Sequence, residues 1–143
     1  MKKLFMLACC FAAFNTALAA DQIAARKEVF EQYKKTMSAM GQMVKGDTPF
    51  SQADFAKLAA HLDELAQQPW QYFGPGSDKG KTDARPEIWS QPAEFQSAIG
   101  KHKHAAQSLK QAATVARNID DVKPAFIAIQ QTCKSCHQQF RND

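Results

Sequence analysis

Apolar residues recur at steps of three and four along four stretches of the chain, at 21–45, 51–68, 90–116 and 122–140. This spacing places them on one face of an amphipathic helix, the face that packs inside a helical bundle. No stretch shows the alternation and the β-branched bias that are typical of strands. The pattern predicts an all-α fold of four helices.

The breaks between these helices predict their arrangement. Gly46 and Pro49 end the first helix, and Ser51 is placed to cap the second. A short turn at 118–121 separates the third helix from the fourth, where Pro124 falls in the first turn and is tolerated. Short connections make neighbouring helices antiparallel, so we expect an up-down-up-down four-helix bundle.

Reactive residues lie on the apolar face of the last helix. Its expected inward-facing positions are Val122, Phe126, Ile129, Cys133, Cys136 and Phe140. The expected inward-facing positions of the first helix are Ile23, Arg26, Phe30, Tyr33, Met37, Met40 and Val44. Both cysteines of the last helix are therefore expected to point into the bundle.

The first nineteen residues have the features of a secretory signal peptide. Lys2 and Lys3 form a basic start, residues 4–14 are apolar, and residues 17–19 offer an Ala-x-Ala cleavage site. The apolar run is too short to span a membrane. We expect a cleaved signal peptide at 1–19, one mature domain at 20–143 and export to the periplasm.

The charge of the mature chain is nearly balanced. Without Lys2 and Lys3, the eighteen basic residues become sixteen against fourteen acidic ones, a net charge of +2. The two signs are interspersed, so the chain does not favour a nucleic acid or a membrane surface as a partner.

The five residues from Cys133 to His137 have the Cys-x-x-Cys-His spacing by which c-type cytochromes attach haem. One helical turn presents both thiols to one edge of the porphyrin, where they add across its two vinyl groups. The adjacent imidazole then supplies an axial ligand to the iron. The motif predicts one covalently attached haem c, held by Cys133 and Cys136, with His137 as the metal ligand.

A structural zinc site or a redox-active cysteine pair is the alternative interpretation. A zinc site needs four ligands, and the mature sequence contains no second cluster of cysteine and histidine. A thioredoxin-like pair needs a βαβ setting, which the helical pattern does not provide. Haem attachment is the better interpretation.

The long connection at 68–89 carries an unusual number of large apolar side chains, namely Trp70, Tyr72, Phe73, Ile88 and Trp89. Packing of these side chains over the end of the bundle is the simpler interpretation. Shielding of a haem edge is the alternative, since long connections in compact domains are often functional.

An exported four-helix chain with this motif near its C-terminus resembles cytochrome c′, the class II c-type cytochromes. The segments at 46–50, 69–76, 83–90 and 133–141 look like recurring segments of that family. The resemblance extends from about residue 24 to 141, almost the whole mature domain. It implies a bundle with haem in its core and, as is common in the family, homodimers through the first two helices.

The resemblance also implies roles for three residues outside the motif. In the family, the residue four positions after an arginine early in the first helix faces the open side of the iron. That arginine resembles Arg26 here, and the position after it is Phe30, which has no lone pair for iron. The resemblance therefore implies five-coordinate iron under an aromatic ring. Arg141 resembles a family arginine near the proximal pocket.

Each of these three residues also has a plainer interpretation. Phe30 fits ordinary core packing on an apolar face. Arg26 either meets a haem propionate inside the bundle or extends its charge to solvent. Arg141 fits a solvated cation at a helix C-terminus, where the helix dipole favours positive charge.

Other side chains are rival ligands for the iron. Met37 and Met40 lie two and three turns beyond Phe30, a displacement along the bundle that favours core packing over ligation. The remaining rivals are Met43, His61, His102 and His104. Core or surface positions suit the histidines better than a second axial bond.

These features predict a periplasmic haem protein, rather than an enzyme, that binds nitric oxide or carbon monoxide at an apolar distal site. Such a site offers bound dioxygen no hydrogen bond, on which the other two gases depend less. The alternative is a soluble electron carrier with periplasmic redox partners and six-coordinate, methionine-ligated iron. Catalysis needs distal acid–base groups, and the predicted face offers only Arg26.

Overall fold

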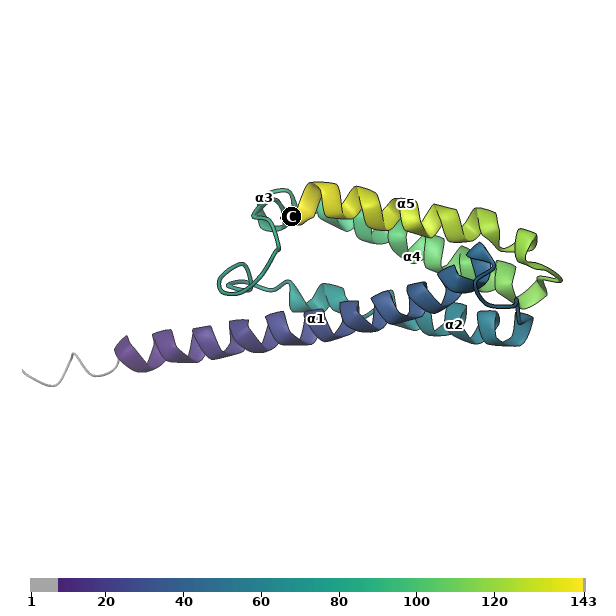
Figure 1. Ribbon diagram of the computed structural model, residues 1–143. Helices are drawn as coiled ribbons and strands as arrows, with labels where there is room; N and C mark the ends of the chain where they lie inside the picture. Colours follow the sequence, from purple (N-terminus) through teal and green to yellow (C-terminus); the bar gives the residue numbers. More distant parts are fainter. Residues whose placement is uncertain (1–7, 143) are drawn as a thin grey trace, which may run out of the picture.

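The computed structural model describes the backbone of residues 8–142 and the side chains of residues 19–142. Its long helices are α1 (Ala8–Lys45), α2 (Gln52–Leu65), α4 (Pro92–Val115) and α5 (Lys123–Phe140). The connections contain a short helix, α3 (Glu87–Ser90), and two 3₁₀ turns, η1 (Pro69–Tyr72) and η2 (Ile119–Asp121). The long helices form the expected antiparallel bundle (Figure 1), and residues 8–142 contain no strand.

The predicted helix ends are confirmed, with one exception. Gly46 follows α1 with a φ of 84°, a conformation that glycine adopts without strain. Ser51 caps α2, because its hydroxyl accepts a hydrogen bond from the backbone N–H of Asp54 at 3.3 Å. The exception is α1, which begins at Ala8 rather than near residue 21.

The N-terminal part of α1 coincides with the predicted signal peptide. Residues 8–20 are rich in alanine and contain neither glycine nor proline, so they favour a helix. The predicted cleavage point after residue 19 therefore falls inside a continuous helix. Residues 1–7 of the predicted signal peptide lie outside the described residues. Within the described part of the chain, no helix is long and apolar enough to cross a membrane.

The four long helices bury one main core and one smaller cluster. The main core is centred on Met40, Phe55, Leu62, Leu109 and Ile129, all of them fully buried. The smaller cluster consists of Ile88, Phe95, Ile99 and Phe140. Trp70, Phe73 and Trp89 of the long connection pack against this second cluster, which confirms the packing interpretation of their role.

The buried face of α1 is rotated slightly from the predicted one. Val29 and Thr36 are buried, whereas Phe30 is 36% exposed and Met37 is half-buried. Steps of three and four identify an apolar face but not its centre, because neighbouring positions on a helix differ by only part of a turn. Phe30 and Met37 therefore lie at the edge of the buried face.

The bundle is open between its first and last helices. α1 packs on α2 and η1, α2 packs on α4, and α4 packs on α5. By contrast, α1 and α5 diverge towards the end of the bundle at which the chain terminates (Figure 1). This divergence leaves room for a cavity beside the Cys-x-x-Cys-His motif.

Candidate functional site

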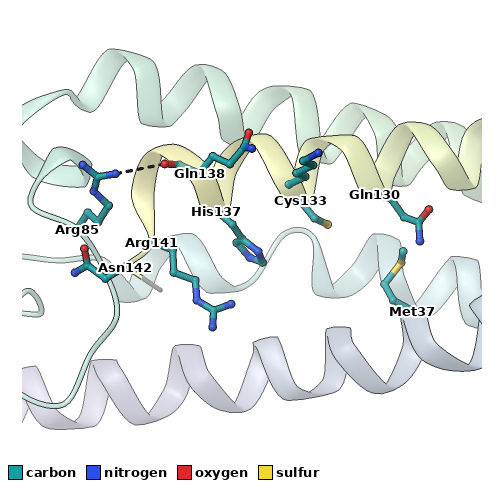
Figure 2. A pocket seen from close by; sticks show the side chains of 9 residues that line it. Met37, Arg85, Gln130, Cys133, His137, Gln138, Arg141 and Asn142 are labelled. Atoms are coloured by element: carbon teal, nitrogen blue, oxygen red, sulfur yellow. Dashed lines mark hydrogen bonds between the residues drawn. The ribbon is translucent and has the colours of Figure 1, made fainter.

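A cavity of about 900 Å³ lies between α1 and α5. Its volume falls within the roughly 300–1,000 Å³ that is usual for cofactor sites. Figure 2 shows side chains of α5 lining one side and Met37 of α1 facing them. The lining residues are Met37, Arg85, Gln130, Cys133, Lys134, His137, Gln138, Arg141 and Asn142.

The two cysteines of the motif are partly buried and carry free thiols. Cys133 lines the cavity, and Cys136 packs beside the smaller cluster one turn further along α5. Burial raises the pKa of both thiols, and the pKa of Cys136 rises to about 11 with a further contribution from Cys133. Both side chains are therefore uncharged at neutral pH.

The imidazole of His137 points into the cavity between Cys133 and Arg141 (Figure 2). Burial, and then the positive charge of Arg141, lower the pKa of this imidazole below its ordinary value. The ring is therefore neutral at pH 7 and has a lone pair for a metal ion. Arg141, at the end of α5, also lines the cavity.

The segment at 83–87 holds the end of α5 that carries this histidine. The backbone N–H of Arg85 donates to the carbonyl of Phe140 at 3.0 Å, and that of Asn142 donates to Asp83 at 2.7 Å. The guanidinium of Arg85 donates to the carbonyl of Gln138 at 3.3 Å. These bonds hold the last turn of α5, a role that the sequence did not indicate.

Arg26 is buried and reaches into the long connection. Its guanidinium donates to the carbonyl oxygens of Tyr72 at 3.2 Å and Ser77 at 2.8 Å, and to the hydroxyl groups of Ser77 and Thr82. It also lies 4.6 Å from the centre of the Phe73 ring. The interpretation of Arg26 as a solvent-extended charge is therefore wrong.

The partners of Arg26 among residues 19–142 are all neutral. Burial lowers the pKa of its guanidinium, because the charged form is partly desolvated. A buried cation is stabilised further by an anion. A haem propionate would supply that anion, so this residue fits the cofactor that the motif predicts.

Phe30 belongs to a group of four rings at the open side of the bundle. Its ring centre lies 5.9 Å from that of Tyr33 and 6.3 Å from that of Trp70. Both of these rings pack against His102, at 5.5 and 6.0 Å. Phe30 does not line the cavity. Tyr33, about one turn further along α1, is buried.

A buried polar pair within this group was missed by the sequence reasoning. The hydroxyl of Tyr33 lies 3.0 Å from Nε2 of His102. Each residue alone has the spacing of a core position, and only the packing of α1 against α4 brings the two together. This side of the bundle is therefore less apolar than the sequence predicts.

The rival ligands occupy different environments. His102 is a core histidine with both ring nitrogens hydrogen-bonded, His61 lies on the surface 3.8 Å from Glu64, and His104 is exposed. Met40 is fully buried in the main core. Met37 packs against the main core, as predicted, and it also lines the cavity.

The chain is similar to known proteins over most of its length. The sequence profile of the family described as Cytochrome C′ matches residues 21–141. The cytochrome c′ of Alcaligenes xylosoxydans xylosoxydans is 32% identical over 121 residues, which cover 85% of this chain and 93% of the relative. The chain belongs to the cytochrome c′ family. Members of this family carry one covalently attached haem c.

Solved structures of cytochromes c′ share this fold. That from Shewanella frigidimarina has a TM-score of 0.83 and 34% identity, covering 87% of this chain and 97% of that one. Two variants of the protein from Alcaligenes xylosoxidans hold carbon monoxide and nitric oxide, respectively. Both structures have a TM-score of 0.81 and cover 87% of this chain. The carbon monoxide complex is 31% identical, with 97% of its chain covered, and the nitric oxide complex is 30% identical, with 96% of its chain covered.

Proposed function

We propose that this chain is an exported haem protein whose five-coordinate iron binds nitric oxide or carbon monoxide. One observation carries the proposal: His137 faces a cavity in which the opposing helix offers no free ligand at the same height. Cys133 and Cys136 would hold the porphyrin by thioether bonds, and His137 would bind its iron. The cofactor supplies a metal centre that takes up diatomic gases.

The height of His137 relative to α1 follows from helix geometry. An α-helix rises about 1.5 Å per residue, so His137 lies about 6 Å beyond Cys133 along α5. Figure 2 shows Met37 opposite Gln130 and Cys133. Because α1 runs antiparallel to α5, the level of His137 corresponds to about residue 33 or earlier on α1.

The side chains at that level do not offer a ready sixth ligand. Phe30 has no lone pair, and the hydroxyl of Tyr33 is hydrogen-bonded to His102. Relatives with carbon monoxide and nitric oxide bound share the fold, which supports gas binding by this chain. Export is supported by the start of the family match at residue 21, directly after the proposed cleavage point.

Gas binding is tested by titrating the reduced, haem-loaded protein with carbon monoxide and nitric oxide while its absorption spectrum is recorded. We expect saturable spectral changes at one site per chain. A spectrum that stays unchanged with both gases contradicts the proposal. Mass spectrometry of the denatured protein checks separately that the haem is attached, because a covalent adduct survives denaturation.

A second function, electron transfer with methionine-ligated iron, is favoured by the position of Met37 in the cavity wall. A thioether sulfur is an established axial ligand of haem iron. Met37 lies about 6 Å along the bundle from the level of His137, and this offset argues against a bond between its sulfur and the iron. Met37→Leu separates the two functions, because only a six-coordinate, methionine-ligated iron changes its spin state in that variant.

A further inference from the structure

A chain of three hydrogen-bonded side chains crosses the bundle, of which Tyr33 and His102 are buried and Thr132 is half-buried. Tyr33 of α1 lies 3.0 Å from Nε2 of His102 on α4, and Nδ1 of this histidine lies 2.8 Å from the hydroxyl of Thr132 on α5. Thr132 directly precedes Cys133, the first thiol of the attachment motif. The chain therefore links the opposing helix to the residue next to the haem anchor.

The hydrogen bonds of this chain can run in either of two directions, and the first follows from the carbonyl of Ile129. The hydroxyl of Thr132 donates to the carbonyl of Ile129 at 2.7 Å, so its oxygen is left to accept from Nδ1–H of His102. Nε2 then accepts from the hydroxyl of Tyr33. Burial lowers the pKa of His102 to about 4, which agrees with a neutral ring that has one donor and one acceptor nitrogen.

The same three groups also satisfy one another in the opposite direction. The hydroxyl of Thr132 then donates to Nδ1, and Nε2–H donates to the oxygen of Tyr33. The change needs no net proton. The imidazole takes up a proton from water at Nε2 and releases its Nδ1 proton to water, so each of the three groups still carries one proton. The carbonyl of Ile129 keeps the helical hydrogen bond of its own turn. In this second state the hydroxyl hydrogen of Tyr33 is free.

Tyr33 is well placed to use that free hydrogen. By the rise of the helix it lies at about the level of His137 along the bundle. It is behind the cavity wall, one turn from the lining residue Met37 and 5.9 Å from the ring of Phe30. Burial, followed by the nearby thiol of Cys133, raises the pKa of Tyr33, so its hydroxyl remains a donor. Of the four rings grouped around Phe30, Tyr33 is the one that carries a hydroxyl.

We propose that Tyr33, supported by His102 and Thr132, donates a hydrogen bond to the diatomic ligand. The inference rests on the proposed function and adds to it a residue that determines ligand specificity. A pocket with such a donor favours ligands that accept a hydrogen bond over those that do not. The proposal adds one hydrogen-bond donor to a distal wall that the sequence predicts to be apolar.

The C–O stretching frequency of bound carbon monoxide tests the proposal. A hydrogen-bond donor beside the ligand lowers this frequency, because it draws electron density from the iron into the antibonding orbital of carbon monoxide. We expect Tyr33→Phe to raise the frequency. Tyr72→Phe removes the other tyrosine hydroxyl of the chain and is expected to leave the frequency unchanged. An unchanged frequency in Tyr33→Phe overturns the proposal.

A second measurement on the unaltered protein applies if Tyr33→Phe does not assemble with haem. Nitrogen-15 NMR of the diamagnetic carbon monoxide complex reports which nitrogen of His102 holds the proton. We expect Nε2, and a proton on Nδ1 overturns the proposal. Absence of any carbon monoxide complex refutes the proposed function instead, so the two failures are distinguishable.

Discussion

Phe30 is the residue whose environment departs most from the prediction. Its ring is 36% exposed at the edge of α1, in contact with Tyr33 and Trp70, instead of being buried at the centre of the helix face. The resemblance to the family still places it over the iron, where it would obstruct an incoming gas. We therefore keep the role of a steric gate as a prediction.

Phe30→Ala is expected to bind carbon monoxide and nitric oxide faster than the parent protein, because no ring has to move aside. The variant should lose less than the roughly 3–5 kcal/mol that follows truncation of a fully buried phenylalanine, since part of this ring is exposed. Stopped-flow measurements of the rates of carbon monoxide and nitric oxide binding test this prediction. Val115→Ala, at an exposed site far from the cavity, is the control, and equal rates in all three proteins would make Phe30 ordinary packing.

His102 is expected to make the protein sensitive to acid. In the unfolded chain its imidazole binds a proton below about pH 6.5, whereas burial among Tyr33 and Thr132 lowers the pKa of His102 in the folded state to about 4. The unfolded state is therefore favoured increasingly as the pH falls from 6.5 to 4. The free energy of unfolding should drop by about 3 kcal/mol over this interval.

Denaturant unfolding of the haem-loaded protein at several pH values measures this drop. His102→Phe keeps an aromatic ring but cannot titrate, so its stability should change less over the same interval. His104→Phe, two positions away and exposed, should behave as the parent. A parent and His102→Phe with parallel pH profiles would show that His102 does not carry the effect.

At the level of secondary structure, Arg26 joins α1 to the long connection. The four hydrogen bonds of its guanidinium reach residues 72, 77 and 82, so a single side chain orders about ten residues without regular structure. This anchoring and the stabilisation of a haem propionate are compatible, because the bonded partners carry no charge. The connection in turn holds the end of α5 through Arg85.

Arg26→Gln is expected to loosen this connection. The loss of charged hydrogen bonds should lower the free energy of unfolding by about 1.5–3 kcal/mol. Amide hydrogen exchange at 72–82 should become faster. Lys27→Gln is the matched control, because Lys27 bonds the carbonyl of Lys81 from the exposed side of the same helix. Unchanged exchange in Arg26→Gln would contradict the anchoring role.

The helices and their ends were predictable because their causes are local. The steps of three and four, the glycine after α1 and the serine before α2 act within one or two turns. The rotation of α1 that buries Val29 and exposes Phe30 was not predictable, because it depends on how α1 packs against α2 and η1. The hydrogen-bond network of Arg26 was equally hidden, since its partners lie about fifty residues further along the chain.

For the whole molecule, the sequence predicted the reactive residues better than their surroundings. Cys133, Cys136 and His137 share one short motif on α5, and the structure places Cys133 and His137 in the cavity wall and Cys136 against the smaller cluster. Met37 and Arg85 enter the cavity wall from distant parts of the chain, and only the opening between α1 and α5 reveals them. The pairing of Tyr33 with His102 likewise required the assembled bundle.

The N-terminal boundary is tested on the intact chain. If residues 1–19 are a signal peptide, the protein isolated from the periplasm begins at Ala20 and lacks the first twelve residues of α1. N-terminal sequencing and the intact mass with one haem measure this. Replacing Ala17 and Ala19 with bulky residues should block the cleavage. A periplasmic protein that begins at Met1 would contradict the prediction.

The ferric electron paramagnetic resonance spectrum of the purified protein tests the central claim most directly, because it reports the spin state and hence the coordination of the iron. With His137 as the only protein ligand, we predict a high-spin spectrum that Met37→Leu leaves unchanged. A low-spin spectrum in the parent that becomes high-spin in Met37→Leu would contradict the account and show that the iron has a methionine as its sixth ligand.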